Sequence, residues 1–136
     1  MSAKEDSNGF GIDIPFAKFV GLHVVEQNEE RSLIRVDQRP ELLNSWGVVT
    51  GGVIMTMLDL AMGAAVRGRV GPKVSVATID ISMAFMSPAS GDLVVEGRVL
   101  KGGSATYFCE AEARSADGKV LFAKGIGTMK PVLPRK

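Results

Sequence analysis

The chain has 136 residues, which suits one domain, and its 46% hydrophobic and 23% charged residues are typical of a globular protein. The 16 Lys and Arg nearly balance the 15 Asp and Glu, and the formal net charge of +1 argues against a nucleic-acid binder. A membrane span is also disfavoured. Asp59 interrupts the most apolar stretch, residues 51–66, whereas a span needs about 20 mostly apolar residues.

The N-terminal residues 1–11 are polar and glycine-rich, without the apolar core of a secretory signal. We expect them to form a disordered tail, because they offer little apolar surface to offset the entropy of ordering. Residues 12–136 are then expected to form a single domain. The one cysteine, Cys109, cannot form an intrachain disulfide. Both features favour a reducing, cytoplasmic location.

The predicted elements begin with a short helix over residues 14–20, in which Pro15 suits the first turn and Gly21 ends the helix. Two strands, a loop and a long helix come next, over residues 22–27, 32–36, 41–49 and 53–66. The long helix is apolar on nearly every side, which predicts burial on several sides.

Four further strands are predicted in the second half of the chain, over residues 75–86, 92–101, 105–114 and 119–129. The pair Asp117-Gly118 between the last two is a good hairpin signal. One helix with two strands before it and four after it indicates an α+β fold. We expect a curved antiparallel sheet wrapped around the long central helix, because the sheet can cover the apolar sides of the helix.

Asp59 is the first candidate for chemistry, because it is a carboxylate within the most apolar helix. Burying a carboxylate without partners costs several kcal/mol, so such groups are usually paired, protonated or functional. Asp59 is therefore a candidate general base. The alternative is a structural aspartate at a helix edge that hydrogen-bonds a neighbouring loop.

The segment Thr50-Gly51-Gly52, just before the apolar run, is the second candidate. A helix start presents unpaired N–H groups, and glycine lets a ligand oxygen approach the backbone, so this segment could polarise a carbonyl. The Asn44 amide can donate to the same carbonyl, and Thr78 places a hydroxyl on the next strand. The structural alternatives are an N-cap for Thr50, turn residues for the glycines, an Asx turn for Asn44 and simple strand propensity for Thr78.

The spacing of Gly51 and Asp59 constrains any reaction that uses both. They are eight residues apart on one helix, which places them about 12 Å apart along its axis. A single scissile bond cannot touch both residues. If both serve one reaction, the site must combine Gly51 of one subunit with Asp59 of another, as a two-fold dimer does naturally.

Other candidates favour structural roles. His23 is the sole histidine, so it offers neither a metal site nor a Cys–His pair. Cys109 lies in an apolar strand without an obvious activator, which favours a core position over a nucleophile. The sequence contains no phosphate-binding loop, dinucleotide fingerprint or metal-ligand cluster. We therefore predict no metal and no cofactor.

Asn44, Thr50-Gly51-Gly52 and Asp59 together resemble the active-site segment of hotdog-fold acyl-CoA thioesterases of the phenylacetate-pathway (PaaI-like) type. Their motif is an Asn, then His-Gly-Gly, then an Asp or Glu one helix stretch later. The segment 77–88 resembles the next strand of that family, and the order of elements matches over about residues 15–129. The resemblance implies a hotdog fold and hydrolysis of an acyl-CoA with an aromatic or a short or medium aliphatic acyl group. It also implies a homodimer with shared active sites, assembled as a dimer of dimers.

The resemblance also implies roles for individual residues. The Gly51 N–H and the Asn44 amide of one subunit would polarise the thioester carbonyl. Asp59 of the facing subunit would activate water or attack directly, and Thr78 would help to hold that water. The implied substrate- and CoA-binding residues are Thr50, Gly52, Ser87, Lys101, Gly102 and Ser104, with Arg67, Arg69 or Lys73 near the CoA phosphates.

Thr50 is a departure from the family motif, which has histidine at this position. A threonine hydroxyl cannot donate from an imidazole, so the change implies slower hydrolysis, a shifted substrate or lost catalysis. The persistence of Asp59 and the glycine helix start favours a retained hydrolase. The alternative is a non-catalytic acyl-CoA binding or sensing protein. A hotdog dehydratase is a weaker alternative, because such enzymes typically pair a histidine with a carboxylate and His23 is poorly placed.

Overall fold

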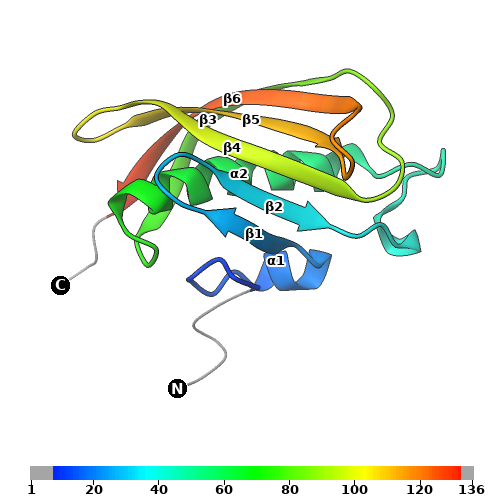
Figure 1. Ribbon diagram of the computed structural model, residues 1–136, viewed down its shortest axis with the longest axis horizontal. Helices are drawn as coiled ribbons and strands as arrows, with labels where there is room; N and C mark the ends of the chain where they lie inside the picture. Colours follow the sequence, from blue (N-terminus) through cyan, green and yellow to red (C-terminus); the bar gives the residue numbers. More distant parts are fainter. Residues whose placement is uncertain (1–7, 133–136) are drawn as a thin grey trace.

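A six-stranded antiparallel sheet curves around one long helix in the computed structural model, which describes residues 8–132 (Figure 1). The helices are α1 (Pro15–Val20), the 3-10 helix η2 (Pro40–Leu42) and α2 (Gly51–Val70). The strands are β1 (His23–Gln27), β2 (Ser32–Val36), β3 (Ser75–Phe85), β4 (Leu93–Gly102), β5 (Tyr107–Ser115) and β6 (Leu121–Val132). The strand order is β1-β2-β4-β5-β6-β3. The predicted α+β fold, with two strands before the central helix and four after it, is confirmed.

The central helix is longer than the sequence predicts. It starts at Gly51 rather than residue 53 and ends at Val70 rather than residue 66. Thr50 has an extended backbone (φ −63°, ψ 144°), so the two glycines that follow it form the first turn of the helix instead of a separate loop. The last turn carries Arg67 and Arg69, and cations at this end favour helix formation.

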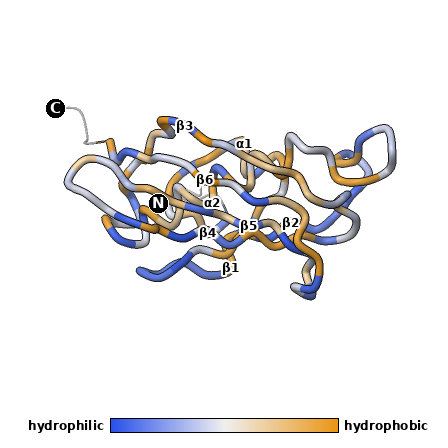
Figure 2. The backbone as a smooth tube through the Cα atoms, turned by 90° about the horizontal axis from the view of Figure 1, so that it is seen from above, coloured by the Kyte–Doolittle hydropathy of each residue, from blue (hydrophilic) through white to orange (hydrophobic). Residues whose placement is uncertain are grey.

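The hydrophobic core lies between α2 and the concave face of the sheet. Met57, Leu58, Ala61 and Met62 of α2 are fully buried. The helix sits directly on β4 because Gly97 has no side chain: a Cβ there would lie 2.3 Å from the Ala61 carbonyl oxygen. Buried and less buried residues alternate along β4 and β5, as expected for a sheet with one covered face. Figure 2 shows hydrophobic and hydrophilic residues interspersed along the backbone.

The segment before α1 packs against the outer edge of β1. The Val24 N–H donates to the Asn8 carbonyl oxygen at 2.9 Å, and the Asn8 side chain donates to the Leu22 carbonyl oxygen. Phe10 is fully buried. The expected disordered tail over residues 1–11 is therefore wrong for residues 8–11, because Phe10 supplies the apolar burial that offsets their ordering. Residues 1–7 lie outside the described part of the chain.

The opposite edge of the sheet is formed by β3, which pairs only with β6 among the described residues. It has 11 residues, most of them exposed. A register shift lies between Thr78 and Asp80, opposite Met129 and Thr128 of β6. The fold therefore leaves one long strand edge without a partner in the described chain.

Helix α2 is the longest helix described, and it falls short of a membrane span: no helix between residues 8 and 132 is long and apolar enough to cross a bilayer.

Candidate active site

Asp59 and Thr78 form a hydrogen-bonded pair between α2 and β3. The Thr78 hydroxyl donates to Asp59 Oδ1 at 2.6 Å, the short distance typical of a hydroxyl bound to a carboxylate. The pair lines a pocket of about 490 Å³, whose other walls include Met55, Met83 and Phe85. No described residue donates to Asp59 Oδ2. The carboxylate is thus oriented through one oxygen, and the other is available to a ligand or water.

The structure corrects the expected burial of Asp59. The sequence predicts a carboxylate enclosed by apolar neighbours, whereas Asp59 is only half-buried. The reason is that it faces β3, the last strand of the sheet, where the layer that covers the helix ends. The alternative of a loop partner is also wrong, since the partner is a strand residue, Thr78.

The start of α2 presents free backbone donors. The Thr50 carbonyl oxygen accepts from the Val53 and Ile54 N–H groups, at 3.1 and 3.4 Å. The Gly51 and Gly52 N–H groups have no backbone acceptor among residues 8–132, as expected for the first turn of a helix. A Cβ at Gly52 would meet nothing within 4 Å, so this backbone is open to a ligand. The geometry fits an acceptor oxygen such as that of a carbonyl.

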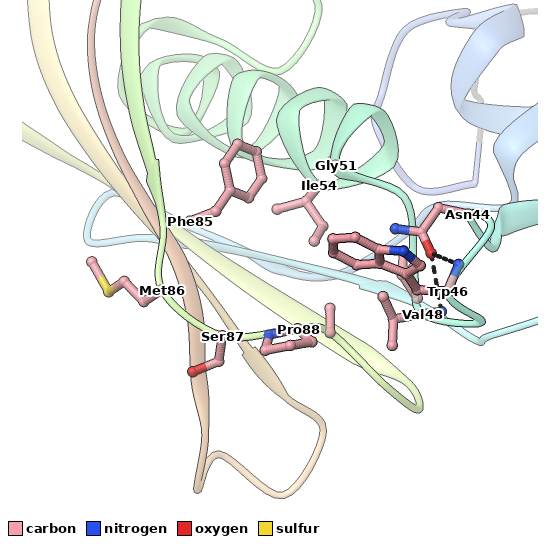
Figure 3. Close-up of a pocket in the computed structure, with 11 residues that line it drawn as sticks. Asn44, Trp46, Val48, Gly51, Ile54, Phe85, Met86, Ser87 and Pro88 are labelled. Carbon is pink, nitrogen blue, oxygen red and sulfur yellow. Dashed lines mark hydrogen bonds between the residues drawn. The ribbon is translucent and has the colours of Figure 1, made fainter.

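The Asn44 side chain forms the Asx turn expected as its structural role, and its amide nitrogen is left to donate elsewhere. Its side-chain Oδ1 accepts from the backbone N–H groups of Trp46 at 2.9 Å and Val48 at 3.3 Å, which is an Asx-type turn (Figure 3). These bonds fix the amide orientation. Nδ2 has no acceptor among the described residues, so it can donate into the pocket that Asn44 lines together with Gly51.

A pocket of about 340 Å³ extends from the start of α2 between two aromatic side chains. Figure 3 shows Phe85 entering from the end of β3 and Trp46 from the loop before α2, with the Ile54 side chain of α2 between them in this view. Neither aromatic residue is among the predicted catalytic or binding residues. The sequence feature that could have indicated this pocket is the only tryptophan, which lies between Asn44 and Gly51.

Gly51 and Asp59 lie in different pockets of the same chain. Phe85 lines both pockets, and a Cβ at Gly51 would lie 3.5 Å from Phe85 Cζ. Eight residues of helix separate the two groups, which corresponds to about 12 Å along the axis. The structure thus places Asn44 with Gly51 in one pocket and Asp59 with Thr78 in another, as two separate groups of candidate site residues.

Of the other predicted binding residues, Thr50 and Gly52 flank Gly51 at the start of α2. The remaining ones lie apart from these two groups or point away from them. Thr50 occupies the expected N-cap position, but its hydroxyl makes no capping hydrogen bond. The Ser87 side chain points away from Gly51 and Asn44 (Figure 3). Lys101 and Gly102 end β4, and Ser104 lines a pocket of about 590 Å³ near the start of β3.

Arg67 is buried and does not reach a phosphate. Only 3% of its surface is exposed, and its Nε and Nη2 have no hydrogen-bond partner in the described chain. Burial lowers the pKa of Arg67 to about 10. The expected phosphate contact is therefore wrong for Arg67. Arg69 and Lys73 are exposed, and they donate to the carbonyl oxygens of Glu29 and Gly11.

Cys109 and His23, which were predicted to have structural roles, line neither the pocket at Gly51 nor the pocket at Asp59. Cys109 is buried, and burial raises the pKa of its thiol to about 11. His23 lies exposed at the start of β1. Between residues 8 and 132, no cluster of three or more His, Cys, Asp or Glu could hold a metal ion.

Comparison with known proteins identifies the family. The model of the thioesterase superfamily matches residues 47–122, which include the start of α2, Asp59 and Thr78. A Saccharolobus solfataricus protein named as a candidate esterase is 32% identical over 112 residues, covering 82% of this chain and 79% of that protein. An acyl-coenzyme A thioesterase of Bos taurus is 26% identical over 109 residues, covering 80% of this chain and 44% of that protein.

Solved structures show the same fold. A conserved protein of Pseudomonas aeruginosa matches with a TM-score of 0.81 at 28% identity, covering 88% of this chain and 94% of that one. The PaaI protein of E. coli, from the phenylacetic acid degradation operon, matches with a TM-score of 0.78 at 17% identity, covering 88% and 86%.

The chain therefore belongs to the thioesterase superfamily and has the hotdog fold predicted from its sequence. The predicted enzyme class, a thioester hydrolase, is confirmed by the names of its family and relatives. This outcome favours hydrolysis over the non-catalytic and dehydratase alternatives that the sequence left open at Thr50.

Proposed function

We propose that the protein is an acyl-CoA thioesterase in which Asp59 acts as the general base on water. The observation that carries this proposal is the Asp59–Thr78 pair, in which a half-buried carboxylate is oriented by a 2.6 Å hydrogen bond beside an open pocket. The second support is the start of α2, where backbone N–H groups and the Asn44 amide can meet a carbonyl oxygen. Similarity to an acyl-coenzyme A thioesterase supports the substrate class.

The proposed reaction uses these groups in sequence. Asp59 takes a proton from water as the water oxygen attacks the thioester carbon, and Thr78 orients the carboxylate. The negative charge that develops on the carbonyl oxygen is stabilised by the Gly51 N–H and the Asn44 amide. The C–S bond then breaks, and protonated Asp59 returns the proton to the leaving thiolate. The products are a carboxylic acid and CoA.

The proposed site forms between two subunits, because Gly51 and Asp59 of one chain lie in separate pockets. The edge strand β3 is the proposed dimer contact. Its free edge runs along Thr78, whereas the edge of β1 is already capped by Asn8 through Val24. The enzyme is then a homodimer with two shared sites, and we propose a dimer of dimers in a reducing cytoplasm that suits the buried free thiol.

The proposed base is tested by Asp59→Asn, which keeps the shape of the side chain and removes the base. We expect the rate of thiol release from a panel of acyl-CoAs to fall about 100-fold or more, the usual contribution of a general base. The matched control is Asp80→Asn, which changes an exposed carboxylate two residues beyond Thr78 on the same strand. Equal rates for Asp59→Asn and the wild type on every acyl-CoA would contradict the mechanism.

The shared site is tested by mixing two inactive chains, Asp59→Ala and Gly51→Pro. Proline is well tolerated at Gly51, because this is the first helical position and Thr50 already has ψ 144°, a backbone conformation favoured before proline. The substitution removes the Gly51 N–H. Random pairing leaves one intact site in each mixed dimer, so co-expression should restore about a quarter of wild-type activity. A site contained within one chain gives no recovery.

A further inference from the structure

We propose that the pocket between Trp46 and Phe85 binds a compact apolar acyl group, with the Trp46 indole as the outer wall that limits its size. The inference rests on the proposed function, because the pocket opens beside the Gly51 N–H and the Asn44 amide that would hold the thioester carbonyl. A carbonyl bound there has its acyl group within reach of this pocket.

The pocket chemistry favours the acyl group over the pantetheine arm of CoA. Besides the Trp46 indole N–H, only Asn44 and Ser87 among the lining residues supply polar side-chain groups, and Ser87 points away from Gly51 (Figure 3). The pantetheine arm carries two amides, which lose hydrogen bonds to water on burial and need partners in return. The remaining walls, which include Val48, Ile54 and Pro88, offer apolar side chains instead.

The Trp46 side chain lines the pocket but does not contribute to local folding. It is 85% exposed, the highest value among the large hydrophobic residues described. The backbone N–H of Trp46, not its indole, donates to Asn44 Oδ1 and holds the turn. Covering the indole with an apolar ligand removes that surface from water, which is favourable. The side chain is therefore available for binding rather than for stability.

The size of the pocket sets the limit on the acyl group. Its volume of about 340 Å³ is near the lower end of the roughly 300–1,000 Å³ found for small-molecule pockets. Phe85 closes the side toward Asp59, since its ring lies close to Gly51. Trp46 lines the opposite side of the pocket (Figure 3). A long aliphatic chain must displace the indole, whereas a single ring or a chain of a few carbons does not.

The sole tryptophan makes the first experiment direct, because Trp46 is the only source of indole fluorescence. The probe is S-(2-oxohexyl)-CoA, in which a methylene between sulfur and carbonyl prevents hydrolysis. We expect a saturable shift of emission to shorter wavelength with this analogue and no shift with CoA alone. The inference is overturned if CoA alone gives the same shift, or if ligand-free protein already emits as a buried indole, which would mean that another chain covers Trp46.

Calorimetry with the same analogue separates the inference from the proposed function. Binding without any change in Trp46 emission overturns the acyl pocket and leaves the thioesterase proposal standing. Failure of every acyl-CoA analogue to bind overturns both.

Variants of Trp46 test the size limit. We expect Trp46→Ala to weaken binding of S-(2-oxohexyl)-CoA about tenfold, the effect of losing about 1.4 kcal/mol of contact, without weakening binding of S-(2-oxohexadecyl)-CoA. Trp46→Phe should stay within about threefold of the wild type, since it keeps an aromatic wall. Phe108→Ala, on the outer face of β5, is the matched control and should change neither. Equal weakening of both analogues by Trp46→Ala would rule out a role in acyl size.

Discussion

Asp59 and Arg67, two charged residues of the central helix, have surroundings opposite to those predicted. Asp59 was expected to be buried and is half-exposed, whereas Arg67 was expected at the surface and is 3% exposed. Both follow from the orientation of the helix about its own axis. A helix that is apolar on nearly every side gives no amphipathic pattern from which to read this orientation. Only the packed structure shows which side faces the edge of the sheet.

Cys109 provides a pH-dependent prediction at the residue scale. Burial raises the pKa of its thiol from 9.0 to about 11. The folded protein therefore keeps a proton that the unfolded chain loses, and the free energy of unfolding should fall as the pH rises from about 9 to 11. Two units of pKa correspond to about 3 kcal/mol at most. The measurement is urea unfolding at several pH values.

Cys109→Ala is the control for this prediction, because lysines and the tyrosine also titrate in the same range. The variant is expected to be less stable near neutral pH and to lose less stability on alkalinisation than the wild type. Parallel pH profiles for the two proteins would show that the thiol does not contribute.

At the scale of elements, the position of α2 depends on small residues that let backbones approach one another. Gly97 lies under the Ala61 carbonyl, and Gly68 of α2 lies against the Asn28 carbonyl, where a Cβ would be 2.2 Å from the oxygen. Gln27 and Ser32 tie the same region together by donating to the carbonyl oxygens of Ala64 and Ala61. These contacts hold the helix close to the β1–β2 end of the sheet.

Two identical substitutions on α2 test this close packing. Gly68→Ala should destabilise the protein by about 2 kcal/mol or more, because the backbone of Asn28 must move. Gly63→Ala is the matched control: its Cβ would lie 3.6 Å from Arg67 Nη1, an ordinary contact, and alanine favours the helix by about 0.5–1 kcal/mol. Chemical denaturation measures both, and equal effects would contradict the packing described.

At the scale of the whole molecule, the two edges of the sheet differ. The edge of β1 is short, and its Val24 N–H donates to the Asn8 carbonyl oxygen. In contrast, β3 offers 11 residues with no strand beside its outer edge in the described chain. A long unprotected edge is a template for pairing with another chain. The proposed dimer uses this edge, and the proposed shared site depends on it.

Charged substitutions at the two edges test the dimer. Ile79→Lys places a like charge from each subunit at the edge of β3, so we expect the dimer dissociation constant to rise about tenfold or more and activity to fall at low protein concentration. Val25→Lys on β1 is the matched control, since Val25 is similarly exposed (59% against 56% for Ile79). Light scattering coupled to size exclusion measures both. Dissociation caused by Val25→Lys alone would assign the contact to the other edge.

The order of the elements and the α+β class could be predicted from local sequence patterns. Local signals sufficed for these, because Pro15 and Gly21 mark the first helix, and the hydrophobic pattern separates strands from the central helix. Element ends were less certain: β6 starts two residues later than predicted and runs three residues further, to Val132, because pairing with β3 continues to Ser75.

The grouping of the candidate site residues depends on long-range contacts. The hydrogen bond between Asp59 and Thr78 spans 19 positions of sequence, and the pocket at Gly51 takes one wall from the loop at Trp46 and another from the end of β3 at Phe85. Such groupings depend on how the helix is rotated and where the sheet ends. These are properties of long-range packing, which the local sequence pattern does not encode.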